Sequence, residues 1–199
     1  MKCTILDYGT GNIQSVHQAL AYLGHDVKRV TSPSFDQSDV VVFPGQGSFG
    51  PAIQALHRQN LLTPLQQYIQ SKRPFIGICL GFQLLFNGSE ESVGDAGIGA
   101  FDGHFKRFTH DLSVPHMGWN QISTTEGASV LNSFQNEYFY FVHSYYLPLH
   151  SCPYAFATTD YGHPFVSAMA TPTQLITQFH PEKSGDAGLA LLDSFFKEL

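Results

Sequence analysis

The sequence predicts an α/β protein built on an open, mostly parallel sheet with helices on both faces, extended towards the C-terminus by mixed or antiparallel strands. Up to about residue 90, short apolar runs alternate with segments whose apolar residues recur at helical spacing. These runs are apolar at almost every position, which is typical of strands covered on both faces of a parallel sheet. Beyond that point, glycine-marked turns and strand-like runs replace the helical patterns.

The first half of the chain begins with a strand, a glycine turn and a helix. Residues 2–6 form a short apolar run, and the glycine-containing segment 7–11 ends it. Valine, alanine and leucine residues then recur at helical spacing until Gly24. The same reasoning predicts further strands at 27–30, 40–43 and 75–78, helices within 51–72, and a helix at 80–86 directly after the third of these strands.

The second half is expected to contain mainly strands and one terminal helix. The patterns predict strands at 138–142, 154–158, 165–170 and 175–179, and a helix over 184–199. No internal repeat, low-complexity segment or linker divides the sequence, so we expect residues 1–199 to form a single domain.

The balance of charge argues against nucleic acid as a ligand. Ten lysine and arginine residues stand against sixteen aspartate and glutamate residues, which gives a formal net charge of −6 at pH 7. Proteins that bind phosphate backbones instead concentrate basic residues on one face. Charged residues make up 13% of the chain, against roughly 25% in typical soluble domains. We therefore expect a partner protein to cover part of the surface.

The sequence also argues against a membrane protein and against a disulfide framework. No apolar run approaches the roughly 18 residues of a membrane-spanning helix, and Asp7 interrupts the N-terminal stretch before a signal-peptide core forms. The three cysteines, Cys3, Cys79 and Cys152, are odd in number and form no CxxC pair, which disfavours disulfides and a zinc site. These observations predict a cytoplasmic protein.

A glycine-rich loop follows the apolar run at 40–43. Residues 45–50, Gly-Gln-Gly-Ser-Phe-Gly, satisfy the G-x-G-x-x-G pattern of dinucleotide sites. Such a site also needs an acidic residue about 20 positions later to bind the ribose, and no aspartate or glutamate occurs between Asp39 and Glu90. We favour a loop whose glycines let backbone N–H groups approach an anionic centre.

Cys79 stands where an apolar strand is expected to turn into a helix, within the segment Gly77-Ile78-Cys79-Leu80-Gly81. Glycines two residues either side of a nucleophile are typical of a nucleophile elbow, here with sulfur in place of a serine hydroxyl. The N-terminus of the following helix would favour the thiolate. Most unpaired cysteines are small buried hydrophobic residues, and that interpretation suits Cys3 and Cys152.

His180 and Glu182 can supply the base and the orienting carboxylate that a nucleophilic cysteine requires. They follow an apolar run, and residues i and i+2 of an extended chain face the same way. No H-x-H or H-E-x-x-H spacing indicates a metal, and no motif requires a cofactor. Five other histidines have no comparable context: His17, His25, His57, His150 and His163.

Together, Cys79 in its elbow, the loop Pro44-Gly45-Gln46-Gly47 and the segment His180-Pro181-Glu182 resemble the class I, triad-type glutamine amidotransferases, a family with a flavodoxin-like fold. Within that family, the chain is more similar to the glutaminase subunits of imidazole glycerol phosphate synthases. The closer resemblance rests on four segments: DYGTGN at 7–12, PHMGWN at 115–120, YFVHSY at 140–145 and FHPEKS at 179–184.

The resemblance implies a glutaminase reaction. Cys79 would attack the side-chain amide of glutamine, His180 would transfer the protons, and Glu182 would orient the imidazole, so that a glutamyl thioester forms and is hydrolysed. Backbone N–H groups of Leu80 and of the loop Gly45-Gln46-Gly47 would hold the oxyanion. The family's substrate contacts match Gly47, Gln83, Glu91, Ser144 and Tyr145.

The resemblance also implies a partner. Ammonia that reaches water becomes unreactive ammonium, so its exit must be covered. In the family, the cover is the base of a (βα)8-barrel cyclase subunit, which forms a heterodimer with the glutaminase and makes imidazole glycerol phosphate in histidine biosynthesis. The aromatic residues between 134 and 146 agree with a buried face. The matching interface positions are Asn12, Pro115, Trp119, Asn120, Tyr140 and Lys183.

Two positions depart from the family's pattern: Gln46, where an apolar residue is frequent, and Phe82, where methionine is frequent. Three alternatives stay open on the sequence alone. The first is the same glutaminase chemistry feeding a different barrel synthase, for example one that aminates a sugar or a surface-polysaccharide precursor. The second is a cysteine peptidase or stress-type hydrolase on a similar sheet, and the third is a non-catalytic binding module.

Overall fold

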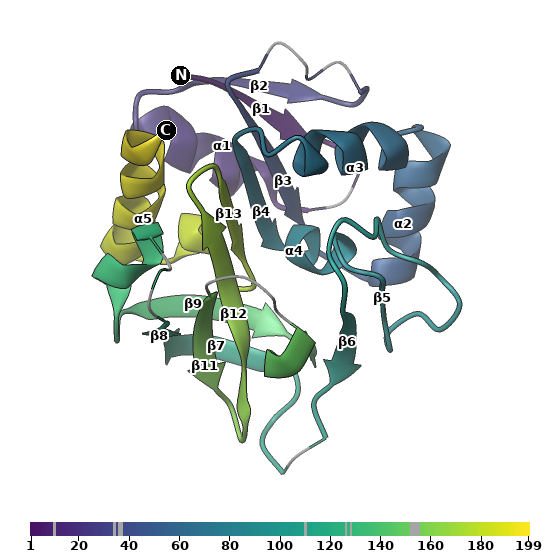
Figure 1. Ribbon diagram of the computed structural model, residues 1–199, viewed down its shortest axis with the longest axis vertical. Helices are drawn as coiled ribbons and strands as arrows, with labels where there is room; N and C mark the ends of the chain where they lie inside the picture. Colours follow the sequence, from purple (N-terminus) through teal and green to yellow (C-terminus); the bar gives the residue numbers. More distant parts are fainter. Residues whose placement is uncertain are drawn as a thin grey trace.

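An eight-stranded sheet forms the centre of the computed structural model, which describes residues 1–9, 11–33, 35, 38–109, 111–125, 127, 129–151 and 156–199 (Figure 1). The strand order is β2-β1-β3-β4-β13-β12-β11-β8. The strands are β1 (Lys2–Leu6), β2 (Asp26–Val30), β3 (Val40–Gly45), β4 (Phe75–Cys79), β8 (Ser123–Thr124), β11 (Phe156–Asp160), β12 (Pro164–Thr171) and β13 (Gln174–Thr177).

The sheet has a parallel part and an antiparallel part, as the sequence predicts. The five strands from β2 to β13 run parallel to one another. Strands β12, β11 and β8 extend the sheet in antiparallel pairing. The expected α/β class, with its antiparallel extension, is therefore confirmed.

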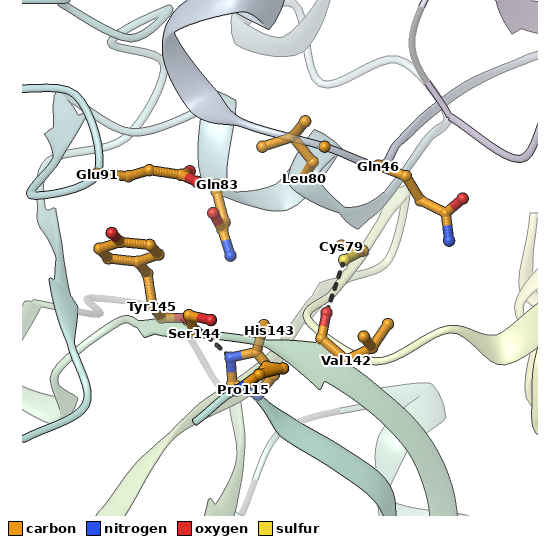
Figure 2. Close-up of a pocket in the computed structure, with 11 residues that line it drawn as sticks. Gln46, Cys79, Leu80, Gln83, Glu91, Pro115, Val142, His143, Ser144 and Tyr145 are labelled. Carbon is orange, nitrogen blue, oxygen red and sulfur yellow. Dashed lines mark hydrogen bonds between the residues drawn. The ribbon is translucent and has the colours of Figure 1, made fainter. Parts of the chain in front are cut away.

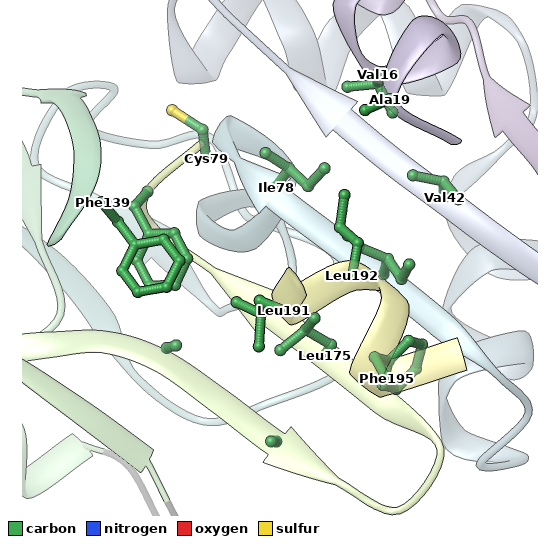
Figure 3. Close-up of a cluster of buried hydrophobic side chains, with 14 of the residues drawn as sticks. Val16, Ala19, Val42, Ile78, Cys79, Phe139, Leu175, Leu191, Leu192 and Phe195 are labelled. Atoms are coloured by element: carbon green, nitrogen blue, oxygen red, sulfur yellow. The ribbon is translucent and has the colours of Figure 1, made fainter. Parts of the chain in front are cut away.

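Helices cover both faces of the parallel part (Figure 1). Helices α1 and α5 pack on one face with Val40 and Val42, while α2, α3 and α4 pack on the other with Val41 and Phe43. This alternation is the two-residue period of a strand buried on both sides. Figure 3 shows the first face, where Leu191, Leu192 and Phe195 of α5 lie against the sheet. The helices are α1 (Ile13–Tyr22), α2 (Phe49–Arg58), α3 (Leu62–Gln70), α4 (Leu80–Leu84) and α5 (Gly185–Glu198).

Two smaller sheets and three short 3-10 helices complete the described chain. One small sheet contains three strands, in the order β10-β6-β5, and the other pairs β7 with β9 in antiparallel register. The strands are β5 (Gly88–Ser89), β6 (His104–Arg107), β7 (His116–Gln121), β9 (Tyr138–His143) and β10 (Tyr145–Tyr146). The 3-10 helices are η1 (Ser129–Phe134), η2 (Leu149–Ser151) and η3 (Pro181–Lys183).

Some boundaries differ from the sequence predictions. The helix expected at 80–86 ends at Leu84, because Leu85 and Phe86 donate their N–H groups to the third residue back, as in a tight turn. The strand expected at 175–179 ends at Thr177. Residues 154 and 155 of the strand expected at 154–158 lie outside the described residues, and β11 begins at Phe156.

Candidate functional site

Three neighbouring parallel strands end at one edge of the central sheet. Gly45, the last residue of β3, is in register with Cys79, the last residue of β4, and Thr177 at the end of β13 is in register with Ile78. The carboxyl ends of parallel strands in an open α/β sheet form the usual ligand crevice. This pairing brings the glycine loop, Cys79 and the segment after Thr177 together, although they are far apart in the sequence.

Cys79 occupies a sharp turn between β4 and α4. Its backbone has φ +55° and ψ −109°, a conformation that a non-glycine residue rarely adopts. Such strained conformations cluster at active sites and ligand-binding sites. A Cβ atom at Gly81 would overlap the carbonyl oxygen of Phe43, and one at Gly45 would overlap the Tyr8 hydroxyl. At Gly77 the nearest atom would be 3.2 Å away, so the close approach depends mainly on Gly81 and Gly45.

His180 and Glu182 are in direct contact. The His180 Nδ1 atom lies 2.8 Å from the Glu182 Oε1 atom, and both side chains are only 2% exposed. The predicted contact is therefore present, but its predicted cause was wrong. The chain is not extended here, because residues 181–183 form the 3-10 helix η3 and this turn brings the carboxylate to the ring.

The surroundings of His180 favour its charged form. Burial lowers the pKa of its imidazole, but the charge of the Cys79 thiolate and the Glu182 carboxylate outweigh burial and raise the pKa to about 10. The Nε2 atom is buried and makes no hydrogen bond within the described chain, so we attribute the rise mainly to the thiolate charge. The arrangement therefore favours a protonated imidazole at His180.

The Cys79 sulfur also has two polar neighbours. It lies 3.9 Å from the carbonyl oxygen of Val142 (dashed in Figure 2), and the Gln178 amide Nε2 lies 3.8 Å away as a donor. Gln178 is itself held by Gln83, whose amide donates to the Gln178 Oε1 atom at 3.0 Å. No motif in the sequence pointed to Gln178. The available signal was a glutamine within an apolar run, two residues before His180.

A cavity of about 290 Å³ opens beside Cys79 (Figure 2). All five residues at the family's substrate-contact positions, Gly47, Gln83, Glu91, Ser144 and Tyr145, line it. Neither His180 nor Glu182 is among its lining residues. The remaining lining residues are Gln46, Cys79, Leu80, Pro115, Val142 and His143.

Glu91 and Gly47 illustrate how the cavity rim is held. The Glu91 Oε2 atom accepts a hydrogen bond of 2.9 Å from the N–H of Phe49, the first residue of α2, so this carboxylate is half-buried and fixed. In an isolated acidic run, such a residue would be expected on a solvated loop. Gly47 has φ +103°, a backbone conformation that glycine adopts without strain. Gln46 lines the cavity next to it.

Comparison with known proteins identifies the family. A family model described as glutamine amidotransferase class-I matches residues 4–199. The chain belongs to the class I glutamine amidotransferases. Two solved structures, a glutamine amidotransferase and PurLQS from Thermotoga maritima, share the fold with TM-scores of 0.73 and 0.76. Each is 15% identical to this chain, and each match covers 98% of this chain and 97% of the other.

Curated relatives carry a more specific name. Imidazole glycerol phosphate synthase subunit HisH of Methanothermobacter thermautotrophicus is 42% identical, with 96% of each protein covered. The subunit HisH of Thermus thermophilus is 39% identical over 96% of this chain and 95% of its own length. The chloroplastic synthase hisHF of Arabidopsis thaliana is 41% identical over 96% of this chain. The chain spans 33% of that longer protein, and 38% of the corresponding protein of Schizosaccharomyces pombe.

Class I membership bears on the alternatives considered above. It gives the enzyme class as glutamine amidotransferase rather than peptidase or non-catalytic module. Within this amidotransferase, the glycine loop at 45–50 lies beside Cys79, consistent with a loop that faces an anionic centre. Phe82, where methionine is frequent in the family, is fully buried and packs edge-to-face on Phe86 and Phe105.

The sheet of β7 and β9 presents an exposed apolar face next to the cavity of this amidotransferase. Met117, Trp119 and Tyr138 are 62%, 56% and 51% exposed, which is unusual for large apolar side chains that gather on one small sheet. Trp119 pairs across the strands with Tyr140, and their ring centroids are 6.3 Å apart. Val142, two residues beyond Tyr140 on the same face of β9, lines the cavity.

The other predicted interface residues have varied surroundings. Asn12 caps α1 by accepting from the Ser15 N–H, so it also has a local structural role. Lys183 is half-buried and makes no ion pair within the described residues. The aromatic residues between 134 and 146 are only partly a surface group, because Phe134, Phe139 and Phe141 lie in the core.

The remaining cysteines were interpreted as buried hydrophobic residues. Cys3 is buried, and burial raises the pKa of its thiol to about 12. A thiol with this pKa is unreactive near neutral pH. Cys152 lies outside the described residues. No described helix has the length and apolar character needed to span a bilayer.

Proposed function

We propose that the chain hydrolyses glutamine at Cys79 and supplies the ammonia to a (βα)8-barrel cyclase subunit, for imidazole glycerol phosphate synthesis in histidine biosynthesis. One observation carries the chemistry. Cys79 stands in a strained turn between the glycine loop and the His180–Glu182 pair, at a cavity lined by all five of the family's substrate-contact positions. The names of the relatives HisH and hisHF support the pathway.

The proposed reaction uses the side chains and backbone N–H groups of the site, with water as the second substrate. The Cys79 thiolate forms a bond to the amide carbon of glutamine, and the resulting oxyanion is held by N–H groups of Leu80 and the loop Gly45-Gln46-Gly47. His180 gives its proton to the departing nitrogen, the C–N bond breaks, and ammonia departs. A glutamyl thioester then remains on Cys79. His180 then accepts a proton from water, which attacks the thioester and releases glutamate and the thiolate.

The cavity suits an amino acid with a free α-amino group. The Glu91 carboxylate is fixed at the rim by the N–H of Phe49, and a carboxylate there attracts an ammonium group. Ser144 and Tyr145 form the opposite side of the lining, as Figure 2 shows. These contacts would select free glutamine over the side chain of a glutamine within a peptide.

The exposed face of β7 and β9 supports the proposed partner. Met117, Trp119 and Tyr138 would be covered by a protein that docks over the cavity mouth, and the cover would keep ammonia away from water. In this proposal Asn12, Pro115, Tyr140 and Lys183 surround the same contact, and Asn120 contributes through its backbone, because its side chain lies on the other face of β7 against His116. The names of the relatives give no support to the alternative partner, a synthase that aminates a sugar or a surface-polysaccharide precursor.

The test separates ammonia production from ammonia use. In the complex with the cyclase subunit from the same genome, Cys79→Ala should abolish glutamine-dependent formation of imidazole glycerol phosphate, a loss on the order of 10⁴-fold or more. Synthesis from added ammonium salt should stay within about twofold of wild type, because the cyclase is unchanged. Equal loss of both activities would refute the proposed division of labour.

A further inference from the structure

Two buried histidines connect the segments that form one wall of the cavity. His116 begins β7 directly after Pro115, and His143 ends β9 directly before Ser144. The two histidines are 3% and 5% exposed and stand opposite each other in the β7–β9 register. The His116 Nδ1 atom lies 3.0 Å from the His143 Nε2 atom. Because Pro115, His143 and Ser144 all line the cavity, this contact lies at its wall.

The proton positions on His143 follow from its partners. Its Nδ1 atom lies 2.7 Å from the Tyr145 carbonyl oxygen, which can only accept, so Nδ1 carries a proton and donates. Burial lowers the pKa of His143 to about 3, despite the opposing effect of this hydrogen bond. The ring is therefore neutral, its Nε2 atom carries no proton, and that atom must accept from the His116 Nδ1–H.

The proton positions on His116 are fixed from the other end. The Asn120 side-chain oxygen accepts from the Gln121 N–H at 2.8 Å, which turns the Asn120 amide nitrogen towards His116 and the Asp160 carbonyl. An amide nitrogen only donates. The His116 Nε2 atom, 3.2 Å away, must therefore accept. The hydrogen bonds therefore form one series in which Asn120 donates to His116, His116 donates to His143, and His143 donates to the Tyr145 carbonyl oxygen.

Aromatic rings hold the histidine pair in place. The His116 ring stacks between Phe141 and Tyr161, with centroid distances of 4.8 Å and 4.0 Å and an interplanar angle of 23° in both cases. Phe165 packs against both histidines, with ring-centroid distances of 6.0 Å to His116 and 5.2 Å to His143. Polar groups that are buried in such an apolar enclosure depend on one another for hydrogen bonds, because they are out of reach of bulk solvent.

We propose that His116 and His143 are positioning residues for glutamine binding, and that the chain Asn120–His116–His143–Tyr145 fixes the backbone of residues 143–145 against the substrate. This inference rests on the proposed glutaminase function. The Tyr145 carbonyl oxygen is held on the His143 side, so that it does not turn into the cavity and add its negative dipole to the Glu91 carboxylate. Loss of this series of hydrogen bonds should therefore weaken glutamine binding more than it slows the chemical step.

Imidazole ¹⁵N NMR tests the hydrogen-bond chain without any variant or substrate. At pH 7, long-range ¹⁵N–¹H spectra of the wild-type chain should show His116 and His143 neutral, each with its proton on Nδ1. This tautomer is the less common one for a free imidazole, so a merely space-filling role would not enforce it. A proton on Nε2 of either ring, or a charged ring at pH 7, would overturn the proposed chain.

Steady-state kinetics with a matched pair of variants test the positioning role. His143→Leu removes the donor to Tyr145 and should raise KM for glutamine about tenfold, with kcat changed less than threefold, as expected for one lost buried hydrogen bond. His143→Asn keeps an N–H near the Nδ1 position and should restore most of the affinity. His57→Leu, a change to an exposed histidine on α2, serves as the control.

The outcomes distinguish the two proposals. A folded His143→Leu variant with unchanged KM, or one that loses kcat alone, would refute the positioning role. If His143→Leu does not fold, His116→Asn, which keeps a donor near Nδ1, and His116→Gln, which does not, provide the same contrast. A wild-type complex that does not hydrolyse glutamine would refute the proposed function instead. The tautomer measurement would still test whether the hydrogen bonds from Asn120 through the two histidines to Tyr145 are present.

Discussion

The two walls of the cavity are held in different ways. Cys79, the glycine loop and His180 follow β4, β3 and β13, and each of these strands has a neighbour on both sides in the eight-stranded sheet. The opposite wall includes Pro115, which precedes β7, Val142 and His143 at the end of β9, and Tyr145 in β10, and it therefore belongs to the two small sheets. There β9 and β10 each have one neighbouring strand, β7 and β6, and side-chain hydrogen bonds and aromatic packing add to this one-sided backbone pairing.

This contrast suggests a division of tasks. Groups that break and form bonds need fixed geometry. Backbone pairing on both sides provides it at the carboxyl ends of β3, β4 and β13, here called the parallel edge. A small sheet with an exposed apolar face can instead respond to a docked protein. We therefore expect changes at the parallel edge to affect chemistry, and changes on β7 and β9 to affect binding and partner response.

The largest effects should come from the parallel edge. His180→Asn should reduce glutamine turnover on the order of 10⁵-fold, because the imidazole takes part in every proton transfer. Glu182→Gln should cost roughly one to two powers of ten less, because the carboxylate orients and stabilises the ring. Single-turnover formation of the thioester measures both losses. If Glu182→Gln proved as damaging as His180→Asn, the assignment of the acid and base would be wrong.

A smaller effect should come from the partner. We expect the chain alone to hydrolyse glutamine slowly and to accelerate about a hundredfold or more when the cyclase and its acceptor ligand are bound. A misdirected oxyanion donor in the loop 45–47 costs about 3 kcal/mol of transition-state stabilisation, and the partner can restore it only by binding the active arrangement better. Steady-state glutaminase assays with and without partner and ligand measure this, and a high rate in the free chain would contradict it.

Lys183 provides a way to separate that acceleration from the basal chemistry. It follows Glu182, is half-buried and has no ion-pair partner within the described residues, so a carboxylate of the cyclase can pair with it. Lys183→Ala should reduce the partner-induced acceleration several-fold and leave the slow basal rate intact. A variant that slows both states equally would place Lys183 in the chemistry rather than in the partner response.

On the β7–β9 face, loss of Trp119 should weaken docking. Trp119→Ala removes a large exposed ring from the proposed contact and should raise the Kd for the cyclase about 30-fold, the effect of an interface hot spot worth about 2 kcal/mol. Tyr22→Ala removes an even more exposed ring, 79% against 56% for Trp119, from α1 and is the control. Titration calorimetry compares the two. Equal effects would show that the cyclase does not dock on this face.

The smallest change is electrostatic. In the wild-type chain the pKa of His180 is raised to about 10, so the ring is charged at neutral pH. Cys79→Ser keeps the size of the side chain but removes the thiolate charge, so burial is opposed by Glu182 alone and the pKa should fall. NMR titration of the His180 ring follows this shift. An unchanged titration midpoint would mean that the thiolate does not raise the pKa.

The sequence predicted the parallel edge well because its signals are local. Apolar runs marked β3, β4 and β13, and closely spaced glycines marked the turn at Cys79. The contact of His180 with Glu182 followed from a short motif, although its turn geometry did not. The resemblance to the family seen in the sequence also rests on these local patterns, and it requires no knowledge of the pairing between distant strands.

The opposite wall could not be predicted in the same way. Residues 116–121 lack an apolar alternation, because outward positions carry Met117 and Trp119 while an inward position carries His116. Its contact with His143 joins residues 27 positions apart, and no local pattern indicates it. Gln178 was missed for a related reason. Its place in the site depends on the hydrogen bond to the Cys79 sulfur, and only the folded structure brings these two residues together.

The central claim, that Cys79 is the nucleophile for glutamine, can be tested by covalent labelling. A glutamine analogue with a diazoketone in place of the side-chain amide should bind the cavity and alkylate the thiolate. Peptide mass mapping of the wild-type chain should then find one label per chain, on Cys79, with Cys3 and Cys152 unmodified, and excess glutamine should slow the reaction. Label on Cys3 or Cys152, or a folded chain that hydrolyses glutamine while Cys79 stays unlabelled, would contradict the account.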